Sequence, residues 1–188
     1  QFPSLYIERR SAKLGLGSAY RFGFRWGLDR GFDELIEMDA DMSHRVRDLA
    51  SMIDAKSKDS DAGLVIGSRW TKGGSTINWP KQRELLSRGA NLYVRFMLGM
   101  GVADATAGFR IYSADTLRRI NLAEIKSEGY SFQIEMTRAA KKAGAKIIEV
   151  PITFRERESG VSKMSKAIVR EAMMRVTVWG LKRFLHFK

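Results

Sequence analysis

The sequence predicts an α/β protein built on a largely parallel sheet. Short apolar runs typical of strands alternate along the chain with segments of helical periodicity. Glycine-rich or polar turns separate them, and no repeat, low-complexity tract or interdomain linker interrupts the pattern. A length of 188 residues, of which 44% are hydrophobic and 29% charged, suits one globular domain with a core of its own.

The first half of the chain predicts strands at residues 4–8, 33–38 and 62–66, and helices at 15–29 and 45–56. In the first helix Ala19, Phe22 and Trp26 lie near one face, and Gly31 follows its end. In the second helix the residues at core spacing are Leu49, Met52 and Ile53. Residues 69–80, rich in glycine, serine, threonine, asparagine and proline, predict a loop.

The second half predicts a long helix at 81–100, a strand at 109–112, a helical turn at 114–120 and a helix at 130–143. A strand is expected at 146–154, where Pro151 indicates an edge position or a bulge. Residues 155–162 are expected to be a loop, and the chain is expected to be helical from Lys163 onward. Because Leu5-Tyr6-Ile7 already resembles a strand from the middle of a domain, we expect an N-terminal piece to be lacking.

The composition excludes some sites and favours an anionic partner. There is no cysteine, and the two histidines are His44 and His186, which excludes thiolate zinc sites and multi-histidine metal sites. The net charge of +12 is typical of proteins that bind nucleic acid, an anionic membrane or a phosphorylated ligand. Residues 155–188 hold nine basic and three acidic side chains, half of the net charge (9 − 3 = +6).

The C-terminal segment, residues 163–188, is interpreted as a basic amphipathic helix at a membrane surface. Apolar side chains such as Met173, Val176 and Trp179 alternate with lysine and arginine. The alternative is a terminal helix that packs on the core. No run of about 18 apolar residues is present, so no complete transmembrane helix is expected.

Asp39-Ala40-Asp41 is the strongest candidate site. It closes the strand expected at 33–38, and alternate strand residues point the same way. The carboxyl ends of strands in an open α/β sheet are where ligands usually bind. Two carboxylates there can hold Mg²⁺ or Mn²⁺, which in turn neutralises a diphosphate. A solvated acidic loop is the plain alternative for an isolated Asp-x-Asp.

Basic and glycine-rich motifs add candidate anion sites. Gly15 and Gly17 open a helix whose N-terminus can receive phosphate, or they form a closely packed turn. Arg83 and Ser87 share a helix face, and with Arg69 nearby they suit a phosphate; a solvated basic helix start is the alternative.

Three later motifs leave structural and functional roles open. Asp104 precedes the segment 105–110 and can cap that turn with its side chain. Glu135, on the helix expected at 130–143, is a candidate to face the site. The loop with Arg157, Ser162 and Lys163 can close over an anionic substrate.

The ordered combination of motifs resembles one family closely. In sequence they are the segments 15–20 (GLGSAY), 37–44 (EMDADMSH), 67–69 (GSR), 83–91 (RELLSRGAN), 106–110 (TAGFR) and 157–163 (RESGVSK). This pattern resembles the dolichol-phosphate (polyprenol-phosphate) mannose synthases, inverting glycosyltransferases of family 2 with the Rossmann-like GT-A fold. The resemblance covers nearly all of residues 5–163, and the family's first strand motifs have no counterpart here.

The resemblance implies roles for individual residues. Asp39 and Asp41 would coordinate the metal, Mg²⁺ or Mn²⁺, with Asp41, Arg83 and Arg157 as the catalytic set. The substrate-binding set would be Arg69, Arg83, Ser87, Arg157 and Lys163. Residues 1–162 would form the GT-A domain, truncated at its N-terminus, with residues 163–188 as the membrane-surface helix. The isolated chain is not assured of activity, because the absent segments carry much of the base and ribose binding.

The implied reaction transfers mannose from GDP-mannose to dolichyl or polyprenyl monophosphate. The implied location is peripheral, on the cytoplasmic face of a membrane, with a membrane-anchor subunit as a compatible partner and without nucleic acid. Two alternatives stay open: a polyprenyl-phosphate glucosyltransferase that uses UDP-glucose, and a non-catalytic basic membrane-binding module.

Overall fold

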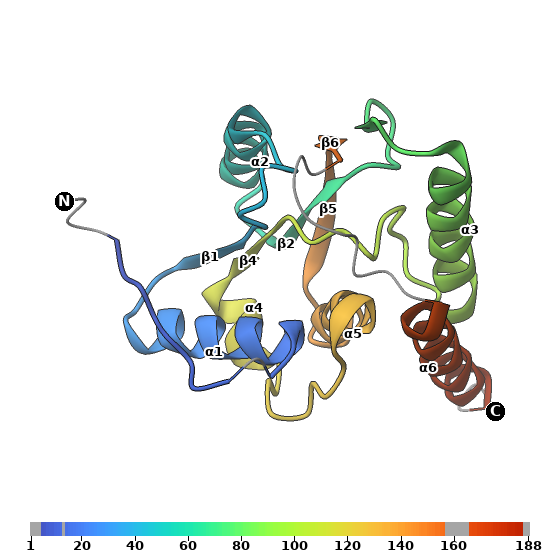
Figure 1. Ribbon diagram of the computed structural model, residues 1–188. Coiled ribbons are helices and arrows are strands. Elements are labelled where there is room, and N and C mark those ends of the chain that lie inside the picture. Colours follow the sequence, from blue (N-terminus) through green and yellow to red (C-terminus); the bar gives the residue numbers. More distant parts are fainter. Residues whose placement is uncertain (1–4, 13, 157–165, 186–188) are drawn as a thin grey trace.

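A computed structural model describes residues 5–12, 14–156 and 166–185 (Figure 1). Its main sheet has four strands in the order β1 (Glu34–Glu37), β4 (Arg110–Ser113), β2 (Ala62–Ser68) and β5 (Lys146–Pro151). β2 and β5 pair in parallel, whereas β4 runs antiparallel to both β1 and β2. Three of the four strands therefore share one direction, as expected of a mostly parallel α/β sheet.

Helices cover both faces of this sheet (Figure 1). α2 (Val46–Lys58) covers one face, and its Met52 packs in a small core with Val65 and Ile111. The helices α1 (Leu16–Asp29), α4 (Ala114–Arg119) and α5 (Gly129–Lys142) cover the other face over a larger core. β2 is buried along its whole length, which explains its nearly continuous apolar sequence.

α3 (Lys81–Leu98) and α6 (Lys166–Leu185) pack against each other beside the sheet. The hydroxyl groups of Tyr93 and Thr177 are 2.7 Å apart, and Val176 is buried in the larger core. The described part of the C-terminal segment is thus helical and lies on the domain. No helix among the described residues has the length and hydropathy needed to cross a bilayer.

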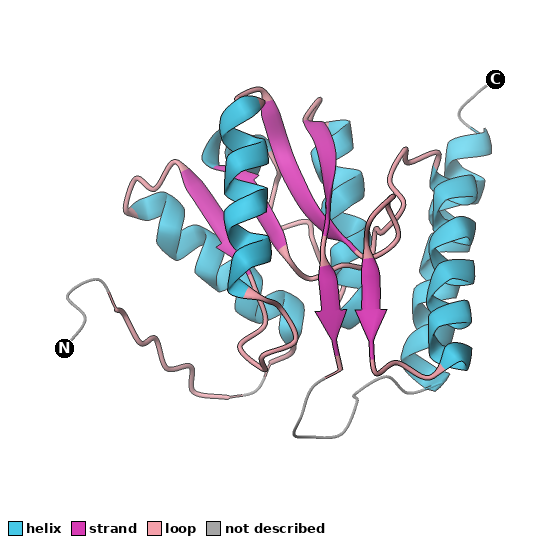
Figure 2. Cartoon of the chain, turned by 90° about the horizontal axis from the view of Figure 1, so that it is seen from above, coloured by secondary structure: helices cyan, strands magenta, loops and turns pink. Residues whose placement is uncertain are grey.

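A second, two-stranded sheet was not expected from the sequence. β3 (Ser75–Ile77) lies within the segment expected to be a loop and pairs in parallel with β6 (Thr153–Arg155) (Figure 2). The strand expected at 146–154 divides after Pro151, because proline has no N–H to donate to a ladder. The prediction that Pro151 marks an edge position or a bulge is confirmed, since β5 is the edge strand of its sheet.

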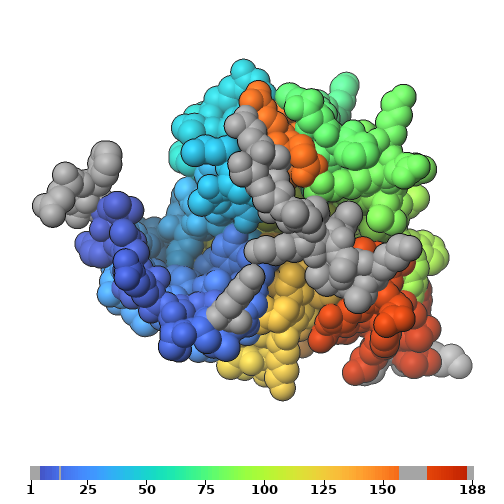
Figure 3. Space-filling model, in the orientation of Figure 1, coloured from blue at the N-terminus to red at the C-terminus, as the bar shows by residue number. Residues whose placement is uncertain are grey.

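The prediction of a strand at residues 4–8 is wrong. Residues 5–10 form no strand, and Leu5, Tyr6 and Ile7 are exposed at the side of the molecule (Figure 3). Tyr6 packs on Trp26 with ring centroids 5.2 Å apart, so this segment lies along α1. An apolar run becomes a strand only where another strand offers hydrogen bonds to it, and in the described structure none does.

The sheet directions bring several loops to one edge. β1, β2 and β5 end on the same side, and β4 begins there because it runs in the opposite direction. The loops after the three parallel strands and the loop before β4 therefore meet, as is usual for ligand sites in open α/β sheets.

Candidate active site

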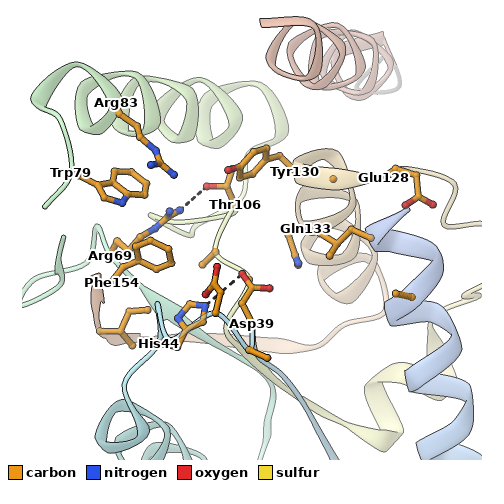
Figure 4. A pocket seen from close by; sticks show the side chains of 18 of the residues that line it. Asp39, His44, Arg69, Trp79, Arg83, Thr106, Glu128, Tyr130, Gln133 and Phe154 are labelled. Atoms are coloured by element: carbon orange, nitrogen blue, oxygen red, sulfur yellow. Dashed lines mark hydrogen bonds and ion pairs between the residues drawn. The ribbon is translucent and has the colours of Figure 1, made fainter. Parts of the chain in front are cut away.

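A cavity of about 700 Å³ opens at this edge (Figure 4). The loops after β1, β2 and β5, the loop before β4, and the N-terminal ends of α1 and α5 supply its walls. Carboxylates gather on the wall after β1, and arginines and aromatic rings on the wall formed by β2, α3 and β6.

Asp39 and Asp41 both line the cavity. β1 ends at Glu37, one residue before the expected end, so they lie in the loop at the carboxyl end of the strand, as expected. The Tyr20 hydroxyl donates to Asp39 Oδ1 at 3.4 Å, and the Ser43 amide donates to Asp41 Oδ1 at 3.1 Å. The turn after Asp41 is tight, since Met42 adopts a φ of 63°. Together these contacts bring both carboxylates to the cavity.

A third carboxyl group, Glu37, lies buried behind this wall. Gln133, which lines the cavity, donates a hydrogen bond from Nε2 to Glu37 Oε1. Burial raises the pKa of Glu37 to about 8, although Arg110 opposes the rise. Glu37 is therefore largely protonated at neutral pH.

His44 lines the cavity next to Asp39. Its ring packs between Phe109 and Phe154, with centroids at 4.7 Å and 5.3 Å, and its Nε2 is 4.0 Å from Asp39 Oδ2. Burial lowers the pKa of His44, in spite of the opposing charge of Asp39. The imidazole is therefore neutral at pH 7.

Arg69 is the most firmly held cation of the opposite wall. Its Nε donates to Asp104 Oδ2 at 2.7 Å, and its Nη2 donates to Asp104 Oδ1 at 2.8 Å and to Thr106 at 2.9 Å. Burial alone would raise the pKa of Asp104, but the charge and hydrogen bonds of Arg69 lower it. Asp104 thus orients Arg69 in addition to shaping the turn.

Arg83 lies at the start of α3 and lines the same cavity. Its Nη1 pairs with Glu156, and its guanidinium carbon is 4.1 Å from the centre of the Trp79 ring. Ser87, one turn further along α3, lines an adjoining groove and not the cavity itself. All three residues of the expected cluster line that groove, and Arg69 and Arg83 line the cavity as well.

The helix N-terminus considered for phosphate holds one of the protein's own carboxylates. Glu128 accepts hydrogen bonds from the amides of Gly17 at 2.6 Å and Ser18 at 3.1 Å, and it pairs with Arg21 at 3.1 Å. Gly15, at φ 94°, passes so close to Glu128 that a Cβ there would collide with the carboxylate. This anion site is filled by Glu128.

Most of this chain matches a known protein family. The family model for glycosyl transferase family 2 matches residues 1–120. This chain belongs to glycosyltransferase family 2. It is 52% identical to the undecaprenyl-phosphate mannosyltransferase of Micrococcus luteus over 179 residues, 95% of this chain and 72% of that protein. It is 49% identical to the polyprenol monophosphomannose synthase of Mycolicibacterium smegmatis over 178 residues, 95% of this chain and 66% of that protein.

A solved glycosyltransferase structure has the same fold. The glucosyl-3-phosphoglycerate synthase of Mycobacterium tuberculosis, determined with Mn²⁺ and UDP-glucose, superimposes with a TM-score of 0.60 at 15% identity. The alignment covers 97% of this glycosyltransferase and 57% of that chain. With the family match, the likeness confirms the GT-A fold expected from the sequence.

Two of the expected site residues of this glycosyltransferase, Arg157 and Lys163, lie outside the described residues, as does Ser162. Glu135 does not line the cavity and accepts a hydrogen bond from the Ser127 amide at 2.9 Å. Gln133, two residues earlier and so on another side of α5, faces the cavity instead.

Other wall residues of this glycosyltransferase were not predicted from the sequence: Trp79, Glu128, Tyr130, Gln133 and Phe154. Their positions depend on contacts between distant segments, and, apart from Trp79, no local motif marks them. The cluster of proline, asparagine and tryptophan at residues 78–80, just before a helix rich in arginine, is the one sequence signal that could have indicated Trp79.

Proposed function

We propose that this glycosyltransferase, in its full-length form, transfers mannose from GDP-mannose to a dolichyl or polyprenyl monophosphate, with inversion at the anomeric carbon. The observation that carries the proposal is the pairing of two walls across one cavity: Asp39 and Asp41 face Arg69 and Arg83. The names of the two bacterial relatives support both the lipid phosphate acceptor and the sugar.

The acceptor phosphate needs little activation. Its second pKa is about 6, so it is largely dianionic near pH 7. One of its oxygens attacks the anomeric carbon, the bond from that carbon to the diphosphate breaks, and GDP leaves. The main difficulty is to bring two anions together, and the guanidinium groups of Arg69 and Arg83 reduce that repulsion. Arg157 and Lys163 belong to the same proposed anion-binding set.

Asp39 and Asp41 would hold Mg²⁺ or Mn²⁺. The described residues contain no cluster of three or more acidic, histidine or cysteine side chains placed to hold a metal ion. Two carboxylates, completed by substrate phosphates and water, are a usual way to bind Mg²⁺. The Mn²⁺ in the M. tuberculosis enzyme of the same fold supports a divalent cation. The bound cation would stabilise negative charge on the leaving diphosphate.

A peripheral position on the cytoplasmic face of a membrane fits α6. The side chains of Met174, Val178, Leu181 and Leu185 are exposed and recur at helical spacing along one face. Lys182 and Arg183 accompany them, and basic residues beside an apolar helix face favour an anionic lipid surface. A separate membrane-anchor subunit is compatible with this arrangement.

The closest alternative keeps the chemistry and changes the donor to UDP-glucose. The UDP-glucose bound to the M. tuberculosis enzyme keeps this alternative open. The third hypothesis, a non-catalytic basic membrane-binding module, gives Asp39 and Asp41 no role.

The deciding experiment measures transfer of radiolabelled sugar to organic-extractable lipid by the full-length enzyme. GDP-mannose and UDP-glucose are compared with polyprenyl phosphate as the acceptor, with Mg²⁺ or Mn²⁺ and with EDTA. Label from GDP-mannose alone, lost with EDTA, is expected. Label from UDP-glucose alone would overturn the donor, and label from neither would favour a binding role.

A further inference from the structure

A narrow apolar groove adjoins the polar cavity. It lies between α3, α5 and α6, and its apolar lining includes Leu86, Ala90, Val94, Ile134, Met173 and Val176. The cavity and the groove share five lining residues: Arg69, Trp79, Arg83, Thr106 and Tyr130. The groove is small, about 60 Å³, so a ligand whose anionic head lies beside the arginines can place the start of an apolar tail in it.

Trp79 stands where the two spaces meet (Figure 4). One of its neighbours is the Arg83 guanidinium, 4.1 Å from the ring centre, and another is Phe154, with ring centroids 5.5 Å apart. Arg69 also approaches the Trp79 ring, at 5.3 Å. The indole thus contacts both arginines and offers its apolar body to the groove.

The Trp79 ring and the Glu156 carboxylate both contact the Arg83 guanidinium. The buried Nε of this group has no hydrogen-bond partner among the described residues. Contact with a rigid aromatic ring limits where such a group can lie. Loss of the ring would remove one of these two restraints, so that the guanidinium could pivot about its pair with Glu156 at the junction of the cavity and the groove.

We propose that Trp79 positions the acceptor and selects a lipid phosphomonoester over a soluble one. The ring holds Arg83 beside the phosphate, and it forms the wall that the first apolar segment of the lipid passes as it enters the groove. A soluble phosphate ester with a polar substituent gains nothing from that groove. This inference rests on the proposed function, because it assigns a residue to the acceptor side of that reaction.

The test uses the full-length enzyme with two probes, farnesyl monophosphate and glycerol 3-phosphate. Binding of each is measured by calorimetry, and KM and kcat are measured with farnesyl monophosphate as the acceptor. Trp79→Leu removes the ring, and Trp79→Phe keeps an aromatic surface. Trp26→Phe is the matched control, because Trp26 lies on α1 beside Tyr6 and Phe32 and lines neither space.

Trp79→Leu is expected to raise the KM for farnesyl monophosphate about 10-fold, the loss of one well-placed aromatic contact, while the donor KM stays unchanged. Its preference for farnesyl monophosphate over glycerol 3-phosphate should fall. Trp79→Phe should recover much of the loss, and Trp26→Phe should match wild type. A residue that only stabilised the fold would not change acceptor and donor constants separately.

A second variant reports on the groove even if Trp79→Leu fails to fold. Ala90→Phe fills the groove from α3, so it should weaken the binding of farnesyl monophosphate without weakening the binding of glycerol 3-phosphate. An unchanged acceptor KM in Trp79→Leu, or equal losses for both probes in either variant, would overturn the inference and leave the proposed function standing. Failure of the wild-type enzyme to bind farnesyl monophosphate would overturn both.

Discussion

Asp39 and Arg69 face one cavity from opposite walls, but they are held very differently. The Asp39 side chain is 44% exposed, and its neighbours among the described residues include the Tyr20 hydroxyl at 3.4 Å and His44 Nε2 at 4.0 Å. The Arg69 side chain is 7% exposed and is fixed by Asp104, whose side chain is completely buried. Arg69 is thus already ordered by buried contacts, whereas Asp39 has room for further ligands.

This difference suggests how one site can serve two anionic substrates. Preorganised cations need no rearrangement when a phosphate arrives, which favours catalysis. A half-exposed carboxylate such as Asp39 can still adjust to a hydrated cation, and Mg²⁺ keeps several of its waters. The order of the basic wall and the openness of the acidic wall can each be tested by substitution.

The largest effect is expected on folding, from Asp104→Ala. Removing one partner of a buried ion pair leaves Arg69 charged and unpaired, which costs about 3–5 kcal/mol. Urea unfolding followed by circular dichroism measures the change. Asp115→Ala, which breaks the exposed pair with Arg119, is the control and should change stability by less than about 0.5 kcal/mol. Equal effects would mean that the basic wall is not held by its buried pair.

Asp41→Ala tests the acidic wall through activity. Loss of a metal ligand is expected to lower the rate of transfer about 10³-fold or more, with little change in stability. Initial rates are measured over a series of Mn²⁺ concentrations, and Mn²⁺ binding is followed by electron paramagnetic resonance. Asp54→Ala, an exposed aspartate on α2, should behave as wild type. Metal-dependent transfer retained in Asp41→Ala would remove this residue from the metal site.

Arg83→Ala should act mainly on the acceptor. A hydrogen bond from a charged group to phosphate contributes about 1.5–3 kcal/mol, so the acceptor KM should rise about 10- to 100-fold. Steady-state kinetics with each substrate varied in turn separate acceptor from donor effects. Arg95→Ala, an exposed residue of the same helix, is the control. An unchanged acceptor dependence would exclude Arg83 from the phosphate site.

Glu37→Gln should remove a pH dependence of stability. The folded pKa of about 8 lies above the usual value of 4.5, so the folded state keeps a proton that the unfolded state loses between these values. Ionisation of Glu37 in the unfolded state stabilises that state. The free energy of unfolding therefore falls by up to about 1.4 kcal/mol per pH unit as pH rises through that window. The difference between variant and wild type should grow from pH 5 to 8. A constant difference would show that Glu37 ionises freely.

Much of the fold could be predicted because its signals are local. The apolar run before Asp39 marks a strand, and the amphipathic spacing in α1 and α2 marks helices, so the Asp-x-Asp loop could be placed at a strand end. β3 was missed because a three-residue strand is defined by its pairing with β6, 78 residues away in the Ser75–Thr153 contact. The strand expected near Ile7 failed for the same reason, since propensity cannot supply a partner.

The candidate site could be predicted only in part. The motifs indicated which charged residues matter, but not what holds them. Asp104 binds Arg69, which is 35 residues away in the sequence, and Glu128 binds the amide of Gly17, which is 111 residues away. No spacing rule connects such pairs, because the sheet order and the direction of β4 bring them together.

The contact between Glu156 and Arg83 has a further consequence for affinity and release. A phosphate that reaches Arg83 would not meet a bare cation, because it must compete with a carboxylate for the guanidinium. Such competition favours a ligand with two negative charges over a ligand with one. The phosphomonoester substrate of the proposed reaction carries nearly two charges near pH 7, and the phosphodiester product carries one. Competition from a side chain of the enzyme would then help the product to leave after transfer.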